Sequence, residues 1–418
     1  MNTLQSKDMK NFECRFCRCK INYVFVDLGT SPLSNAFLTD KTLDEPEKKF
    51  PLKVFVCENC FLVQLPEFES PGNIFNDYAY FSSYSKSWLE HVENYVNMIT
   101  EKNSLGKDNL VIELASNDGY LLQFFKKKEI PVKGIEPAAN VAKIAQEKGI
   151  ETIVEFFGEK LAKKLSSEGT KADLIIGNNV LAHVPNINNF VKGISILLKT
   201  NGVVNIEFPH LLQIIQHNQF DTIYHEHFSY LSLSTVKKIF EFHNLIIFDV
   251  EEIPTHGGSL RIYAKHMTNK NFKIQHSVNN LLEKEKDFGL MNLSFYLEFT
   301  KKVELIKKKL IEFFNIKEQN GKKIVCYGAA AKGNTLLNFC KINKDSIEYV
   351  VDNNPHKQGL YLPGSHIPIK NPEEIIKTKP DFILILPWNI KEEIMKDTSF
   401  IRDWGGKFVI PIPKVVIL

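Results

Sequence analysis

The chain has 418 residues, of which 44% are hydrophobic and 24% charged, and its formal net charge at pH 7 is +3. These values are ordinary for a globular protein of two or three domains, and they exclude a strongly basic surface of the kind that binds nucleic acid. No apolar run approaches the roughly 20 residues that span a bilayer, and the opening MNTLQSKDMKNF lacks a signal-peptide core, so we expect a cytoplasmic protein without a membrane partner.

Residues 1–71 carry two cysteine pairs among short strand-like runs that are separated by turns. Cys14 and Cys17 form one CxxC pair, and Cys57 and Cys60 form the other. A CxxC turn directs two thiolates at one point, and two such turns complete a tetrahedral zinc site. Because a reducing compartment disfavours disulfides, we predict a closed structural zinc site in a small β-rich module. A redox-active dithiol is the alternative.

Residues 72–265 alternate between strand-like and helical patterns, which predicts a parallel, doubly wound α/β sheet. Nucleotide cofactors bind at the carboxyl ends of such strands. Only Gly119 remains of a phosphate-binding Gly-x-Gly-x-x-Gly pattern, so S-adenosylmethionine, which has no phosphate, fits better than a dinucleotide. A generic α/β turn is the alternative. The candidate cofactor-binding residues, all at strand ends or in the turns that follow, are Glu113, Ala115, Asn117, Asp118, Gly119, Glu136, Asn178 and Asn179.

The stretch Tyr224–Tyr230 places five ionisable side chains in seven consecutive residues. Glutamate, histidine and tyrosine can accept, donate and relay protons near neutral pH. Apolar neighbours such as Phe220 and Leu231 indicate a half-buried segment, where polar groups must be paired or used. On its own this pattern leaves open an acid–base site, a metal site and a polar loop.

Residues 266–418 begin with amphipathic helical patterns over 279–318 and then return to strand–helix alternation. The turn Gly328–Asn334 opens a helix. Backbone amides there, with Lys332 beside them, suit a phosphate or another anion. A turn that only packs the domain is the alternative. These patterns predict a second, smaller α/β domain.

Taken together, the motifs resemble those of a known family, the sugar C-methyltransferases that act on nucleotide-linked keto-sugars. The resemblance covers almost the whole chain. It implies a zinc-binding domain (1–71), a methyltransferase domain of the class I type that binds S-adenosylmethionine (72–265), and a Rossmann-like domain for the sugar nucleotide (266–418). Ala330 stands where the family usually has serine. The motifs, in chain order, are the cysteine pairs with Asp27–Asn35, Tyr80–Tyr84, Glu113–Gly119, Tyr224–Tyr230 and Gly328–Asn334.

The resemblance also implies a substrate and a reaction: methylation at C3 of an NDP-4-keto-6-deoxy sugar, in branched-chain deoxysugar biosynthesis. Carbon beside a ketone becomes nucleophilic when a base removes its proton to give an enolate. The family assigns the base to the position of His227. Residues that match its sugar-orienting or enolate-stabilising groups are Tyr78, His183, Tyr224 and Glu226, and further candidate substrate contacts are Tyr80, Arg261, Lys332 and Asn334.

Two other functions remain as alternatives to C-methylation. An epimerase could use the same enolate and the same sites. A zinc-ribbon nucleic-acid methylase would need a basic stripe and a Pro-Pro-aromatic motif, and the sequence instead has Asn178–His183 at the relevant strand end. We expect a monomer or a homodimer that binds no nucleic acid.

Overall fold

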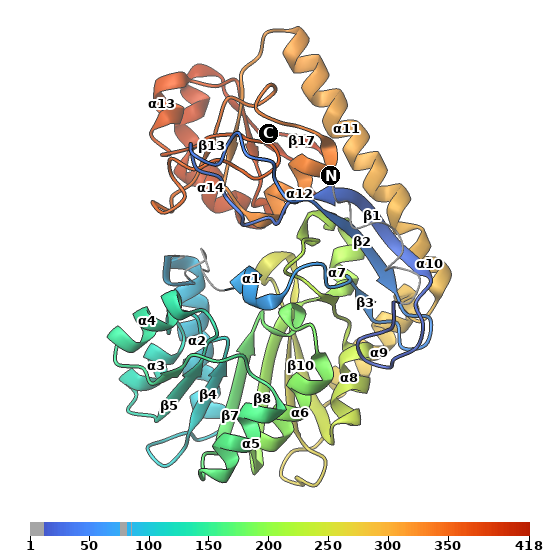
Figure 1. The fold of residues 1–418 in the computed structure, drawn as a ribbon, viewed down its shortest axis with the longest axis vertical. Helices are drawn as coiled ribbons and strands as arrows, with labels where there is room; N and C mark the ends of the chain where they lie inside the picture. Colours follow the sequence, from blue (N-terminus) through green and yellow to red (C-terminus); the bar gives the residue numbers. More distant parts are fainter. Residues whose placement is uncertain (1–11, 76–81, 85) are drawn as a thin grey trace.

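The chain, in a computed structural model that describes residues 12–75, 82–84 and 86–418, folds into two lobes flanked on one side by the long helix α11 (Phe299–Gln319) (Figure 1). The lower lobe holds a seven-stranded sheet and the upper lobe a six-stranded one. A third, four-stranded sheet lies between them, beside α11. Among the described residues, no helix is both long enough and apolar enough to cross a membrane.

The lower sheet has the strand order β10-β11-β8-β7-β4-β5-β6. Its strands β4 to β8 pair in parallel, as predicted, whereas β11 pairs antiparallel with both β8 and β10, so the sheet is mixed. Every residue of β4 is buried, as expected for a strand covered by helices on both faces. The strands are β4 (Val111–Leu114), β5 (Val132–Ile135), β6 (Thr152–Ile153), β7 (Ala172–Asn178), β8 (Leu198–Pro209), β10 (Leu245–Ile253) and β11 (Ser259–His266).

Helices of this lobe follow the strands in the expected alternation. The helices are α2 (Lys86–Lys102), α3 (Leu122–Lys127), α4 (Ala139–Glu147), α5 (Glu159–Ser167), α6 (Ile187–Leu197), α7 (Leu211–Gln216), α8 (Leu233–Phe242) and α9 (His276–Phe288).

The four-stranded sheet joins the N-terminal module to the predicted acid–base segment. Strands β1 (Tyr23–Ser31), β2 (Phe50–Val56) and β3 (Val63–Gln64) pair antiparallel, followed by the short helix α1 (Pro71–Phe75). The fourth strand, β9 (Ser229–Tyr230), comes from the segment Tyr224–Tyr230 and pairs with β3. The N-terminal module therefore contacts that segment through backbone hydrogen bonds.

The upper sheet has the order β14-β13-β12-β15-β16-β17 and is parallel except for β17. Helix α12 begins at Ala331, inside the predicted turn Gly328–Asn334, because a run of alanines favours helix. The elements are α10 (Leu293–Leu297), β12 (Ile324–Tyr327), α12 (Ala331–Cys340), β13 (Val350–Val351), β14 (Ile369–Lys370), α13 (Glu374–Thr378), β15 (Phe382–Ile385), α14 (Lys391–Asp397), β16 (Lys407–Ile410) and β17 (Val416–Ile417).

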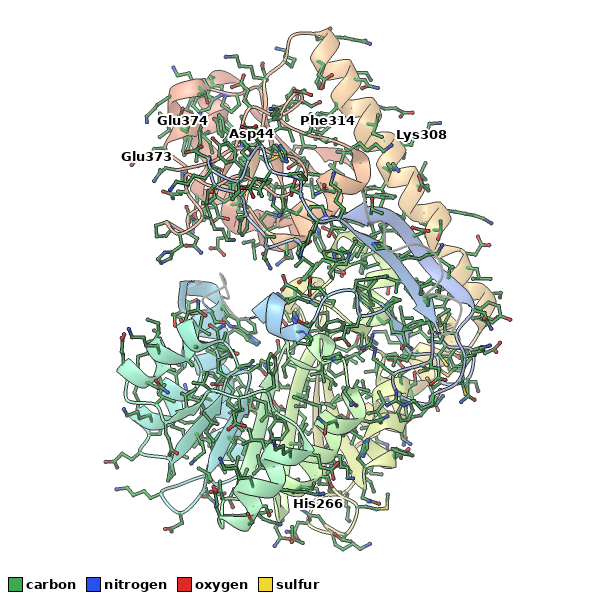
Figure 2. All side chains as sticks on the ribbon, viewed as in Figure 1. Asp44, His266, Lys308, Phe314, Glu373 and Glu374 are labelled. Atoms are coloured by element: carbon green, nitrogen blue, oxygen red, sulfur yellow. The ribbon has the colours of Figure 1, made fainter. Side chains whose placement is uncertain are left out.

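The N-terminal chain between β1 and β2 crosses the upper lobe. Leu38 and Tyr361 exchange two backbone hydrogen bonds, of 2.9 and 2.8 Å. Further along, His366 Nε2 lies 2.6 Å from Glu47 Oε1. Figure 2 accordingly shows Asp44 among the side chains of the upper lobe, while Lys308 points outward from α11. The N-terminal module is thus fixed to both lobes.

Candidate active site

His227 lies at the centre of the predicted acid–base cluster. Its Nδ1 is 2.8 Å from the carbonyl oxygen of Thr222. A carbonyl can only accept a hydrogen bond, so Nδ1 carries the proton and Nε2 keeps a lone pair. Burial, and next the nearby His183, hold the pKa of His227 well below 6.5. At neutral pH this imidazole is uncharged and able to accept a proton.

Two rings that the sequence predicted beside the base pack against it. The rings of Tyr224 and His227 are 4.0 Å apart between centroids, and those of His183 and His227 are 4.7 Å apart. Burial lowers the pKa of His183 to about 4, although a hydrogen bond with the backbone of Glu226 opposes this shift. Both histidines are therefore neutral at pH 7.

Glu226 is the acid of the cluster and is almost fully buried, with 3% of its surface exposed. Burial raises its pKa to about 7, and a hydrogen bond from Asn35 lowers it in part. That bond joins Asn35 Nδ2 to Glu226 Oε1 at 2.6 Å. No residue that the structure describes donates a hydrogen bond to the other oxygen, Oε2.

His225 faces the other way, which separates the two histidines of the motif. Its Nε2 lies 3.2 Å from the carbonyl oxygen of Pro51, and its ring meets Phe50 edge-on. It packs against the N-terminal module and takes no part in the cluster around His227.

The predicted cofactor residues gather at the end of β4. Ala115, Asn117 and Gly119 all have positive φ (55°, 50° and 74°), so the turn coils tightly at the strand end. A Cβ on Gly119 would lie 2.5 Å from Ile150 Cδ1, which only glycine avoids. Glu136, at the end of β5, accepts hydrogen bonds from Asn117 N at 2.9 Å and from Ala138 N. A carboxylate has further lone pairs, so Glu136 can still accept from two ribose hydroxyls.

Other predicted residues line the same strand ends. Burial raises the pKa of Glu113 well above its usual range, and Tyr120, which also neighbours Asn178, partly opposes that shift. Asn179 Nδ2 lies 2.9 Å from His256 Nε2. Within the described part of the chain, Asp118 Oδ1 and Asn179 Oδ1 are buried without a hydrogen bond. Buried unpaired acceptors beside a ribose-suited carboxylate fit S-adenosylmethionine, whose ammonium group needs such partners.

The segment before α2 forms hydrogen bonds with the turn that follows β4. Ser82 N donates to Asn117 Oδ1 at 3.0 Å, and Ser83 N donates to Asp118 Oδ2 at 3.2 Å. Tyr78 and Tyr80, predicted beside the sugar, lie outside the described residues.

Two predicted substrate contacts are engaged elsewhere. Arg261 forms ion pairs with Glu207 at 3.1 Å and with Glu251 at 3.2 Å within the lower sheet. Asn334 is 1% exposed, and its Nδ2 donates to the carbonyl oxygen of Ser34 at 2.6 Å. Asn334 thus joins two parts of the protein through its Nδ2.

Lys332 lies where the lobes meet. Its Nζ donates to Asn389 Oδ1 at 2.7 Å and lies 4.6 Å from the centre of the Trp388 ring. Burial lowers the pKa of Lys332, and the carboxylate of Asp221 raises it in part. This ammonium group is close enough to His227 to contribute to the lowered pKa of that base.

The four predicted metal ligands converge. The Sγ atoms of Cys14, Cys17, Cys57 and Cys60 all lie within 4.8 Å of one another, and two of the pairs are 3.5 Å apart. Zinc–sulfur bonds of about 2.3 Å in a tetrahedron need separations of this size. Cys19 lies outside the cluster.

Sequence reasoning missed three residues of this site: Asn35, Asp221 and Trp388. Asn35 ends the segment Asp27–Asn35, which the family resemblance marked without a role. Asp221 and Trp388 follow no pattern that would have distinguished them.

Comparison with family models matches nearly every part of the chain. A zinc binding domain matches residues 14–75, a methyltransferase domain matches 88–248, and a C-methyltransferase C-terminal domain matches 254–413. Together with the seven-stranded sheet and the cysteine cluster, these matches make the protein a class I methyltransferase that depends on S-adenosylmethionine and carries a zinc-binding domain.

A curated relative narrows the class. C-methyltransferase NovU of Streptomyces niveus is 34% identical over 402 residues, which are 96% of this chain and 96% of the relative. The chain belongs to the sugar C-methyltransferase family that its motifs resembled.

Solved structures of methyltransferases align with part of the chain. A methyltransferase from Clostridium acetobutylicum is 11% identical and covers 43% of this chain and 92% of its own, with a TM-score of 0.34. Magnesium protoporphyrin IX methyltransferase from Synechocystis is 16% identical and covers 46% and 88%, with a TM-score of 0.33. Likenesses this low carry no functional argument.

Proposed function

We propose that the protein methylates C3 of an NDP-4-keto-6-deoxy sugar through an enolate, with His227 as the general base. The observation that carries the proposal is the state of His227. Its Nδ1–H is held by Thr222 while its Nε2 lone pair stays available in a buried, neutral ring. A ring that is already neutral can accept a proton without first losing one.

The first step is proton transfer. His227 Nε2 takes the proton from C3. The electron pair of the C3–H bond forms the C3=C4 double bond of an enolate, and the negative charge collects on the C4 oxygen. Donors fixed in advance stabilise such an oxyanion. The carboxyl group of Glu226, with a pKa of about 7, and the hydroxyl of Tyr224 are the donors beside the base.

Carbon methylation then follows. S-adenosylmethionine, when bound, would supply the electrophilic methyl group to C3 of the enolate and leave as S-adenosylhomocysteine. Glu136 would hold its ribose, and the acceptors Glu113, Asp118 and Asn179 would hold its ammonium end. Positioning both reactants contributes much of the acceleration. The Rossmann-like lobe would hold the nucleotide, with Lys332 directed toward its sugar end.

The relative NovU, as a C-methyltransferase, supports carbon as the acceptor atom. A biosynthetic enzyme with thiolate ligands for zinc also suits the reducing cytoplasm.

The test is incubation of the full-length protein with S-adenosylmethionine and a panel of NDP-4-keto-6-deoxy sugars in deuterated water. We expect a product in which a methyl group has replaced one hydrogen, detected as an increase in mass. Deuterium incorporation at C3 without methylation would instead identify an epimerase. No change in any sugar of the panel would overturn the proposal.

A further inference from the structure

Ser34 and Asn35 lie where all three parts of the protein meet. Asn35 Nδ2 donates to Glu226 Oε1 of the methyltransferase domain at 2.6 Å. The carbonyl oxygen of Ser34 accepts from Asn334 Nδ2, at the start of α12, also at 2.6 Å. Ser34 itself is 2% exposed. The two residues therefore connect the N-terminal module with the acid of the active site and with the upper lobe.

Both sides of this segment are anchored. On one side β1 ends at Ser31 and is paired with β2, whose C-terminal end carries the ligand Cys57. On the other side Leu38 pairs with Tyr361 of the upper lobe. Asn35 is thus fixed between two rigid elements, which is what a group that must orient another side chain needs.

We propose that Asn35 is a positioning residue of the methyl transfer, through which the zinc-binding domain orients the carboxyl group of Glu226. The proposal rests on the proposed function, because it assigns Glu226 a donor role toward the substrate.

The chemistry follows from the hydrogen-bonding capacity of an amide. The NH₂ group of asparagine only donates, so the oxygen it contacts must accept. In a protonated carboxyl group one oxygen is a carbonyl and the other a hydroxyl. Asn35 therefore makes Oε1 the carbonyl and leaves the proton on Oε2, the oxygen to which no described residue donates a hydrogen bond. Oε2 is then the donor available to the C4 oxygen.

The same contact adjusts how readily Glu226 is protonated. Burial raises the pKa of Glu226, and Asn35 keeps it at about 7. His183 and His227 of the same cluster are neutral because burial lowers the pKa of each. Without Asn35 the carboxyl group would be free to rotate and to place its proton on either oxygen.

The test compares Asn35→Ala with Tyr361→Phe in the full-length zinc protein. Tyr361→Phe is the matched control, because it removes the hydrogen bond from Tyr361 to Asp40 Oδ1 (2.8 Å) and loosens the same segment without touching Glu226. Two readouts are used. One is kcat against pH with the keto-sugar, and the other is the infrared carboxyl band of Glu226 in the substrate-free protein, identified by its loss in Glu226→Gln.

For Asn35→Ala we expect kcat to fall about tenfold or more, the loss that removing a hydrogen bond to a charged or ionisable group causes. The titration of the Glu226 band should move to higher pH, and S-adenosylmethionine affinity should stay unchanged. Tyr361→Phe should change neither readout. An unmoved Glu226 titration in Asn35→Ala, or an equal loss in Tyr361→Phe, overturns the proposal.

The infrared readout needs no substrate. If the wild-type protein methylates none of the keto-sugars, the proposed function fails, while the titration of Glu226 still decides whether Asn35 controls this carboxyl group.

Discussion

Trp388, in the upper lobe, donates its indole Nε1–H to Asp221 Oδ2 of the lower lobe at 2.6 Å. Asp221 is fully buried, and burial raises its pKa to about 6, while Lys332 and the indole lower it in part. The next residue, Thr222, supplies the carbonyl that holds His227. The upper lobe therefore contacts the residue that directly precedes Thr222, whose carbonyl orients the base.

This contact predicts the behaviour of Trp388→Phe. Phenylalanine keeps the ring packing but removes the donor, which leaves a buried oxygen of Asp221 unpaired at a cost of about 1–3 kcal/mol. We expect a lower midpoint of thermal unfolding and a lower kcat. Trp404→Phe is the control, because its indole donates to Pro380 O at 3.0 Å within the same lobe, away from His227. Equal effects of the two substitutions on kcat would contradict the coupling.

Local patterns could be read from the sequence, and contacts between distant residues could not. The cysteine pairs and the turn at the end of β4 depend on residues a few positions apart, so their spacing alone indicated their geometry. Asn35 and Glu226 are 191 residues apart, and Asp221 and Trp388 are 167 apart. Such pairs form only when separate domains dock. The ion pair of Arg261 was hidden for the same reason: its partner Glu207 comes from a neighbouring strand, and nothing near Arg261 in the sequence showed it.

His227→Asn tests the base. Asparagine can still donate to Thr222 O but has no basic nitrogen, so turnover should fall by a factor of about 10² or more. Exchange of the C3 hydrogen with deuterated water should be lost together with methylation. Calorimetry should show unchanged affinity for S-adenosylmethionine. His276→Asn, at the exposed start of α9, is the control and should keep full activity. Near-normal turnover of His227→Asn would contradict the assignment of His227 as the general base.

Glu226 makes both activity and stability depend on pH. Its pKa is about 7 in the folded protein and has a usual value of 4.5, so the folded state binds the proton more tightly. The free energy of unfolding should therefore fall by roughly 3 kcal/mol as pH rises from 4.5 to 7, relative to a protein without this group. If protonated Glu226 is the donor, kcat should also fall as pH rises through about 7.

Glu226→Gln supplies the comparison. Denaturant unfolding of both proteins between pH 4.5 and 8 gives the difference in unfolding free energy, in which other titrating groups cancel. As pH rises, Glu226→Gln should therefore become more stable relative to the wild-type protein. A difference that stays constant across this range would show that Glu226 is not a buried acid with a raised pKa.

The zinc ligands should matter for the active site as well as for the N-terminal module. Three residues after Cys60, strand β3 begins, and it pairs Gln64 with Ser229 and Val63 with Tyr230 of β9. Cys57→Ser should lose zinc, speed amide hydrogen exchange in β9 and lower kcat. Cys19→Ser, outside the cluster, should keep about one zinc per chain and protected amides. Metal analysis gives the zinc content, and hydrogen exchange gives the protection of the β9 amides. Protected β9 amides in a zinc-free protein would show that the zinc ligands do not stabilise β9.

Glu136 and Asp352 hold equivalent positions in the two α/β halves and should serve different ligands. Glu136 Oε2 accepts from Asn117 N at 2.9 Å, and Asp352 Oδ2 accepts from Ala329 N at 2.8 Å, each at the end of the strand beside its turn. Both carboxylates support a turn and keep lone pairs for a ribose.

Removing one charge at a time should separate the two sites. Glu136→Gln should weaken S-adenosylmethionine binding about tenfold or more, because a charged acceptor becomes neutral. It should leave the KM of the sugar nucleotide unchanged. Asp352→Asn should do the reverse, so each variant is the control for the other. Calorimetry gives the Kd of S-adenosylmethionine for each variant. Initial rates at varied sugar nucleotide concentration give the KM of the sugar nucleotide for each variant. If Asp352→Asn weakened S-adenosylmethionine binding as much as Glu136→Gln does, the upper lobe could not be a separate nucleotide site.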